Sequence, residues 1–227
     1  MVSRRHLNHL GDASVPVILY SMSGSPYAWR AWLALAYKGI DCELKTLSYD
    51  AGDLNKSEFM ALTPRRRVPV LVDDGFVLFE SAAIIEYIEE RWPGEPRLFS
   101  ADLHQRAIER RMVREADQYF AAGLERLVEA VLFTPAAQRS PERIAAICTD
   151  LRKELAMWEA AIAGDHLAGF LSAADFTLYP QLALIERMGK RNPGLLPADL
   201  VGPKLAAWMG RMTALPVVQA TWPPHWR

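Results

Sequence analysis

Cysteine is scarce in this chain. Cys42 and Cys148 are its two cysteines among 227 residues, and they lie far apart in the sequence. They form neither a C-x-x-C pair nor a zinc-binding pattern, which excludes a disulfide-rich scaffold. The five histidines show no metal-ligand spacing, so no metal ion is expected. This cysteine usage favours a reducing compartment, and we expect a cytoplasmic protein.

Long hydrophobic runs are also missing. No stretch approaches the roughly 18 apolar residues that a membrane-spanning helix requires. Residues 1–14 contain basic side chains but no apolar signal core, and we interpret them as a loose N-terminal extension. We therefore expect a soluble protein with no membrane among its partners.

Neither sign of charge is in excess. The chain has 26 Lys and Arg residues against 27 Asp and Glu residues, a net charge of -1. Such a chain creates no overall field that attracts nucleic acid. The basic run Arg65-Arg66-Arg67 has no aromatic residues interleaved with it, so it does not indicate a nucleic-acid site either.

What the chain does have is an ordinary globular composition, with 51% hydrophobic residues, enough for a sizeable core. Residues 15–96 combine strand and helix signals, and the turn Asp73-Asp74-Gly75 predicts a hairpin. We expect a small mixed sheet with helices on its faces. Its expected elements are a strand at 17–20, a helix at 26–38, a strand at 41–47, a helical turn within 56–62, strands at 69–72 and 76–79, and a helix capped by Ser81 that ends near 92.

Residues 97–227 predict helices only. Apolar residues at three- and four-residue steps indicate one long helix over 103–133. Further helices are expected from Ser140-Pro141 to about Gly164, from the capping-box residues Ser172 and Asp175 to about Gly189, and over 205–212. The fold class is therefore an α/β domain followed by an all-α domain.

The stretch from Ser23 to Arg30 lies between the first strand and the first helix. Ser25 suits the helix N-cap, and Pro26 suits the first helical position. A helix N-terminus favours anions and lowers the pKa of a thiol beside it. Taken alone, this stretch indicates only a capped helix, because Ser-Pro is common at helix starts.

Four stretches in this order resemble the cytosolic glutathione S-transferase family. The stretch 25–30 resembles the catalytic segment of its serine-type tau and zeta classes, and Glu80-Ser81-Ala82-Ala83-Ile84 resembles the family's Glu-Ser-x-Ala-Ile. Pro64 with Val68-Pro69-Val70-Leu71 resembles the cis-proline segment of thioredoxin-like folds. Residues 172–175 resemble the capping box of the helical domain. The resemblance implies a thioredoxin-like domain followed by a helical bundle.

Two departures from the family pattern stand out. Many relatives have Asn-Pro-x-Gly-Lys where this chain has Thr63-Pro64-Arg65-Arg66-Arg67, so Arg66 replaces a small residue. Tyr27 stands where the zeta class has cysteine. For this reason the zeta activity, isomerisation of maleylacetoacetate, is not carried over here.

The resemblance assigns Ser25 the catalytic role of stabilising the glutathione thiolate. Lowering a thiol pKa by roughly 2 units requires about 2.7 kcal/mol. A hydroxyl hydrogen bond to a charged acceptor contributes roughly 1.5–3 kcal/mol, and the helix end adds about 0.3–1 kcal/mol. Ser25 and its helix could therefore supply the shift without a general base. Tyr27 ranks second as the hydroxyl donor.

The resemblance also implies the glutathione-binding residues. Glu80 would accept from the α-amino group, and Ser81 would bind the α-carboxylate at a helix N-terminus. Val68 would pair its backbone with the cysteinyl residue, followed by Pro69 in a cis bond. Arg67 is interpreted either as a contact to the glycyl end or as a solvated surface residue.

The electrophile would lie against the helical domain. Tyr27, Arg114 and Tyr119 are the candidates for that site, and each also fits an ordinary role in the core or on the surface. We expect an enzyme, a glutathione transferase that conjugates glutathione to a small hydrophobic electrophile and, as the family implies, forms a homodimer. The alternatives are another glutathione-dependent enzyme (an isomerase, dehalogenase or ether-cleaving lyase) and a non-catalytic interaction module.

Overall fold

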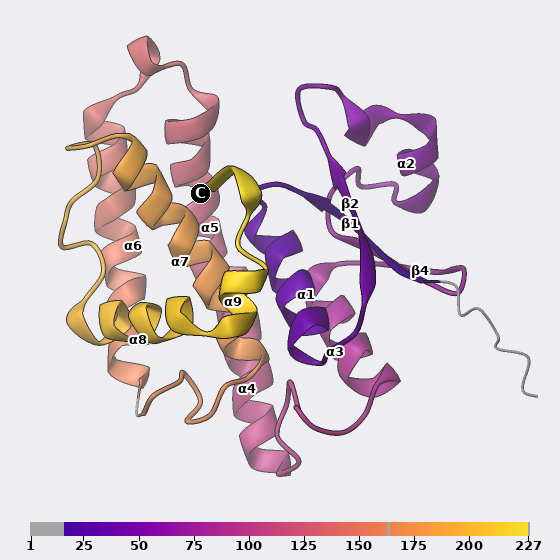
Figure 1. Cartoon of the computed structure of the whole chain (residues 1–227). Coiled ribbons are helices and arrows are strands. Elements are labelled where there is room, and N and C mark those ends of the chain that lie inside the picture. Colours follow the sequence, from indigo (N-terminus) through magenta and orange to yellow (C-terminus); the bar gives the residue numbers. More distant parts are fainter. Residues whose placement is uncertain (1–15, 163, 227) are drawn as a thin grey trace, which may run out of the picture.

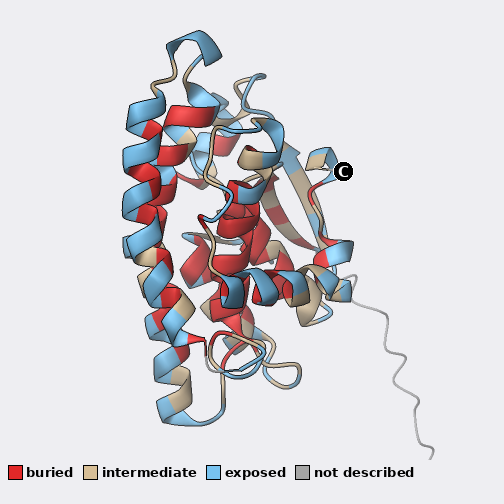
Figure 2. Ribbon diagram, turned by 90° about the vertical axis from the view of Figure 1, so that its left-hand side faces the viewer, coloured by how far each residue is buried: buried red, intermediate tan, exposed pale blue. Residues whose placement is uncertain are grey.

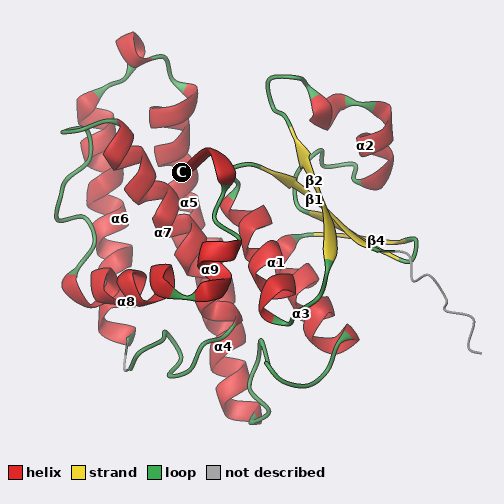
Figure 3. Ribbon diagram, viewed as in Figure 1, coloured by secondary structure: helices red, strands yellow, loops and turns green. Residues whose placement is uncertain are grey.

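The computed structural model describes residues 16–162 and 164–226, so the predicted extension over 1–14 lies outside the described residues. Its first part contains a four-stranded mixed sheet in the order β2-β1-β3-β4 (Figure 3). Strand β1 is parallel to β2 and antiparallel to β3, which is antiparallel to β4. The strands are β1 Val17–Met22, β2 Cys42–Leu47, β3 Val70–Asp73 and β4 Phe76–Phe79.

Three helices accompany this sheet: α1 Pro26–Tyr37, α2 Ser57–Leu62 and α3 Ser81–Arg91. Helix α1 lies between the sheet and the later helices (Figure 1). Its residue Leu33, the β1 residue Leu19 and the α3 residue Ile84 are fully buried members of one hydrophobic core. Burying these apolar faces against each other is what holds the sheet and its helices together.

The predicted long helix over 103–133 is present as one continuous helical path that changes its winding twice. It consists of α4 Leu103–Glu115, a π-helical segment Ala116–Phe120, α5 Ala121–Val128 and a second π-helical segment Glu129–Phe133. A π turn shifts the helix face by one residue and occurs frequently at functional sites. The first of these segments carries Asp117, whose contact is described below.

The remaining helices are α6 Pro141–Ala161, α7 Ala173–Arg191, α8 Pro203–Ala214 and α9 Pro216–Ala220. The predicted serine caps of α6 and α7 are confirmed, since Ser140 accepts from the Arg143 N–H and Ser172 forms the capping box with Asp175. The sequence did not predict α9. Buried residues gather in the interior, with exposed residues along the outer helix faces (Figure 2). No helix within residues 16–162 and 164–226 is long and apolar enough to cross a membrane.

Candidate functional site

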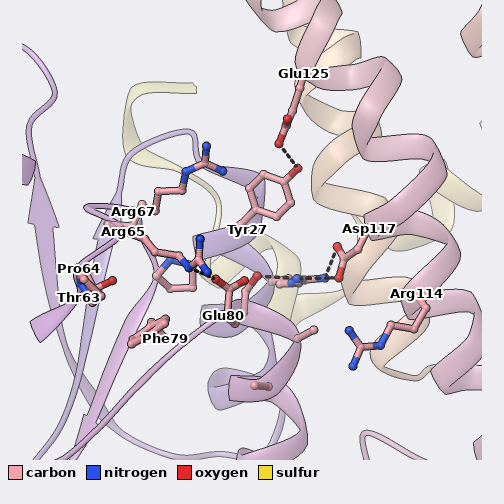
Figure 4. Close-up of a pocket in the computed structure, with 16 residues that line it drawn as sticks. Tyr27, Thr63, Pro64, Arg65, Arg67, Phe79, Glu80, Arg114, Asp117 and Glu125 are labelled. Atoms are coloured by element: carbon pink, nitrogen blue, oxygen red, sulfur yellow. Dashed lines mark hydrogen bonds and ion pairs between the residues drawn. The ribbon is translucent and has the colours of Figure 1, made fainter.

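A cavity of about 870 Å³ opens between the sheet part and the long helix (Figure 4). Four pieces of chain form its walls: the segment before β3, the start of α3, the first turns of α1, and the helical path from α4 to α5. The lining residues are Tyr27, Arg30, Thr63, Pro64, Arg65, Arg67, Val68, Pro69, Phe79, Glu80, Ser81, Ala82, Ala83, Arg114, Asp117 and Glu125.

The segment before β3 has the backbone that the resemblance implied. The Val68–Pro69 peptide bond is cis, and β3 begins immediately after it at Val70. Arg66 has a φ of 52°, in the left-handed region that favours glycine. This chain therefore keeps a left-handed turn at the position where the family has a small residue. The Arg66 Nη1 donates to Asn55 Oδ1 at 3.3 Å.

The start of α3 differs from the expectation in one respect. Ser81 is the first helical residue rather than the cap, and the cap position is held by Glu80, whose φ is 71° and whose side chain makes no capping bond. The prediction that Ser81 caps this helix is therefore wrong. The chain turns sharply at Glu80, which leaves the Ser81 hydroxyl free to accept from Arg30 Nη2 at 2.5 Å.

Arg30 connects Ser81 to the long helix. Its guanidinium donates to both carboxylate oxygens of Asp117, with Nη1 at 2.9 and 3.1 Å and Nη2 at 3.1 Å. Arg30 is 3% exposed, so this two-pronged pair is shielded from solvent and geometrically specific. Neither Arg30 nor Asp117 could be assigned a role from the sequence. The available signal was a charged residue within the apolar helix 26–38.

The other charged side chains of the cavity are less tightly paired. Arg65 Nε lies 3.9 Å from Glu80 Oε1, and both side chains are more than two-thirds exposed, so this pair contributes little stability. Arg114 projects from the long helix toward the cavity, on the same wall as Asp117, and Arg67 extends from the opposite wall (Figure 4). The cavity therefore presents cationic groups on both of its walls.

Tyr27 reaches across the cavity to the long helix. Its hydroxyl donates to Glu125 Oε1 at 3.3 Å. Burial, together with the charges of Glu125 and Asp117, raises the pKa of Tyr27 well above its ordinary value. Tyr27 therefore remains protonated at neutral pH and acts as a hydrogen-bond donor.

Ser25 and Tyr119 lie elsewhere. Ser25 caps α1, accepting from the Ala28 N–H at 3.3 Å, and lines a separate cavity of about 20 Å³. Tyr119 is 63% exposed and lines a different hollow with Arg111 and Glu115. The structure thus gathers most of the predicted residues in one cavity but leaves these two out of it. Those gathered are Tyr27, Arg67, Val68, Pro69, Glu80, Ser81 and Arg114.

Residues 19–96 match the family model of the glutathione S-transferase N-terminal domain. The chain is 36% identical over 174 residues to maleylacetoacetate isomerase of Mus musculus, an alignment that covers 75% of this chain and 78% of that protein. This chain belongs to the cytosolic glutathione S-transferase family.

Solved structures of glutathione S-transferases share the whole architecture. The crystal structure of the glutathione S-transferase from the Antarctic clam Laternula elliptica has a TM-score of 0.79 and 27% identity, covering 93% of this chain and 94% of that one. A glutathione S-transferase-I bound with lactoylglutathione has a TM-score of 0.76 and 25% identity, covering 91% and 98%. The glutathione S-transferase fold, a thioredoxin-like domain followed by a helical domain, is thereby confirmed for this chain.

Proposed function

We propose that this chain is a glutathione-dependent enzyme that binds glutathione in the large cavity and activates its thiol as a thiolate. The contact that carries the proposal joins Ser81, Arg30 and Asp117 on the cavity wall. It combines a hydroxyl and the N-terminus of α3, which suit a carboxylate, with an acidic group beside them. A γ-glutamyl end, with one carboxylate and one ammonium group, matches this arrangement.

The position of the rest of glutathione follows from the placement of its γ-glutamyl end. The ammonium group would lie near Glu80 and Asp117, and the cysteinyl residue would run along Val68 and the cis-proline as an added strand. The thiol would then point toward the N-terminus of α1. Ser25 uses its oxygen to accept from Ala28, so its hydroxyl proton remains available to the sulfur.

Two reactions can follow from a bound thiolate. In conjugation, the sulfur forms a bond to carbon, and either a leaving group departs with the displaced electron pair or a proton is taken up at the neighbouring carbon. In isomerisation, the sulfur adds to an activated double bond, the resulting single bond rotates, and expulsion of the thiolate restores the double bond in its other geometry. Glutathione is consumed only in the first reaction.

The isomerase candidate is favoured by the 36% identity to maleylacetoacetate isomerase, and the cationic groups Arg67 and Arg114 on the cavity walls suit a substrate with carboxylates. Conjugation to a small hydrophobic electrophile is the second candidate. Counting glutathione molecules consumed per molecule of product decides between them: none for isomerisation and one for conjugation.

The experiment that tests the proposal titrates bound glutathione between about pH 5 and 9 and follows thiolate absorbance, with Ser25→Ala and Tyr27→Phe alongside. We expect a bound thiol pKa below the roughly 8.5 of a free thiol, and loss of that shift in Ser25→Ala. If the lowered thiol pKa is lost in Tyr27→Phe and kept in Ser25→Ala, Tyr27 is the residue that stabilises the thiolate. Failure to bind glutathione would leave the interaction-module alternative.

We also propose a homodimer, because dimers are typical of the family. Sedimentation equilibrium measures this directly: a mass near twice 25.5 kDa supports the dimer, and a mass near 25.5 kDa at all concentrations contradicts it.

A further inference from the structure

The last described residues of the chain return to the loop that carries Ser25. We call residues 222–226 the C-terminal strap. Ser23 Oγ and His225 Nδ1 are hydrogen-bonded, although 202 positions separate them. At Gly24, an added Cβ would lie 3.1 Å from two ring atoms of His225 and 3.2 Å from Trp226 Nε1. The strap therefore rests directly on the backbone of the residue that precedes Ser25.

The strap is anchored to helix α1 through Trp29. The rings of Trp222 and Trp226 pack edge-on against Trp29 with centroids at 5.4 and 5.5 Å. Trp29 Nε1 donates to Thr221 Oγ1 at 3.0 Å, just ahead of the strap. Since Trp29 is in the first turn of the helix that Ser25 caps, the strap and the Ser25 hydroxyl share one rigid support.

A second anchor comes from helix α7. Arg187 Nη2 donates to the backbone oxygen of His225 at 2.8 Å, and the Arg187 guanidinium lies 5.1 Å from the ring centre of Trp226. The strap is therefore held between α1 and α7. Because Ser23 binds the strap at His225, the strap links the Ser25 loop to α7.

The space beside Ser25 on this side is almost filled. The cavity lined by Ser25, Trp29, Pro223 and Pro224 among others has a volume of about 20 Å³, close to the minimum for one water molecule. The Ser25 backbone is held by two hydrogen bonds, from its N–H to Met22 O at 3.0 Å and from the Trp29 N–H to its oxygen at 3.0 Å. Its side chain has a single long hydrogen bond, accepted from the Ala28 N–H at 3.3 Å. The direction of the hydroxyl therefore depends on the exact course of the loop from Met22 to Ser25.

We propose that the C-terminal strap is a positioning element for Ser25, in which His225 acts as the positioning residue by linking Ser23 to the strap that α7 holds. His225 makes no contact with glutathione in this proposal, and it acts through the loop. The inference rests on the proposed function, in which the Ser25 hydroxyl donates to the glutathione sulfur. A hydroxyl displaced by a fraction of an ångström would stabilise the thiolate less while leaving glutathione binding intact.

The test compares His225→Ala with His225→Asn, whose side-chain amide can replace the Nδ1 contact to Ser23. We expect His225→Ala to raise the bound thiol pKa toward the free value and to lower kcat by about tenfold, with KM for glutathione unchanged. His225→Asn should bring the bound thiol pKa and kcat back close to their wild-type values. Ser23→Ala should match His225→Ala, and the double variant should be no worse than either.

A second comparison tests the docking of the strap on the loop itself. Gly24→Ala adds a Cβ against the strap at a φ of 88°, whereas Gly75→Ala adds one in open space at a φ of 79°. Because Gly24 adjoins Ser25 and Gly75 does not, a raised bound thiol pKa in Gly24→Ala supports the docking of the strap only where His225→Ala raises it as well. The fold of each variant is checked by its melting temperature.

The outcomes separate the two proposals. An unchanged bound thiol pKa in His225→Ala and in Gly24→Ala, against a lowered value in the wild type, would overturn the role of the strap and leave the proposed function standing. A wild-type protein that binds glutathione with an unshifted thiol would overturn the proposed function first.

Discussion

The guanidinium of Arg30 forms a two-pronged ion pair with the carboxylate of Asp117, which lies 87 positions later in the chain. The same guanidinium donates to Ser81. Arg30 thus joins the first helix, the start of α3 and the π-helical segment of the long helix at the wall of the large cavity. Replacing Arg30 should therefore weaken glutathione binding and lower the stability of the fold.

Arg30→Lys should weaken glutathione binding by about tenfold or more, because an ammonium group cannot make the forked contact to Asp117 while also reaching Ser81. Isothermal titration calorimetry measures the change in Kd. Arg126→Lys is the matched control, since Arg126 pairs with Asp150 at 3.3 Å on the exposed surface. Equal Kd values for the wild type and Arg30→Lys would contradict this prediction.

Asp175→Ala should lower the free energy of unfolding by about 3–5 kcal/mol, because it leaves several buried donors without their acceptor. Asp175 is fully buried and accepts from Leu167 N at 3.0 Å, Ser172 N at 3.0 Å and Trp208 Nε1 at 2.8 Å. Denaturant unfolding monitored by circular dichroism measures the loss. The control is Asp199→Ala, at an exposed carboxylate that pairs with Arg152, and it should cost less than about 1 kcal/mol. Similar losses of stability in both variants would argue against the role of Asp175 as the acceptor of buried donors.

Cys42 and Cys148 should react slowly with thiol reagents near neutral pH. Burial and the neighbouring Asp41 raise the pKa of Cys42 to about 11, and burial raises the pKa of Cys148. At pH 8 a thiol with that Cys42 value is about 0.1% thiolate, against roughly a quarter for a free thiol. Alkylation by iodoacetamide, followed by mass spectrometry, should accelerate as the pH rises toward 11. Rapid modification of native protein at pH 7 would refute the prediction.

Glu109 should make the protein less stable as the pH rises above the unfolded carboxyl pKa of about 4.3. It is fully buried, accepts from Ser100 N at 2.8 Å through one oxygen and has no partner at the other. Burial raises its pKa, so in this window the folded state binds more protons than the unfolded state, and stability falls as the pH passes through the raised value.

Glu109→Gln tests this linkage, because an amide does not titrate. Denaturant unfolding at several pH values from about 4.5 to 8 should show a smaller decline for the variant than for the wild type. Glu90→Gln, at an exposed carboxylate near the end of α3, should leave the decline unchanged. Parallel curves for the wild type and Glu109→Gln would assign the pH dependence to other groups.

Much of the fold could be predicted from the sequence because its signals are local. A serine followed by proline marked the starts of α1 and α6, the turn Asp73-Asp74-Gly75 marked the hairpin, and three- and four-residue steps marked the long helix. Each signal depends on residues within one or two turns. The two π-helical segments escaped prediction because they alter the winding without interrupting the apolar pattern.

The residues of the candidate site could be identified partly from the sequence and partly from the tertiary structure. Val68, Pro69, Glu80 and Ser81 could be assigned by their resemblance to family motifs, and they line the cavity. The resemblance could not show that Ser81 is the first helical residue, because the turn at Glu80 follows from a backbone φ of 71° rather than from residue type. Tyr119 was a reasonable candidate by helical position, but it lies in the π-helical segment beside residues of α6, outside the cavity.

The sequence by itself determined the order and type of most elements, the caps of α1, α6 and α7, and the family, since these follow from neighbouring residues. Only the tertiary structure decided the ion pair between Arg30 and Asp117 and the contact between Ser23 and His225. Those pairs lie 87 and 202 positions apart, and their meeting depends on how the helices pack. Long-range packing is set by the shape of the whole core, which no local pattern records.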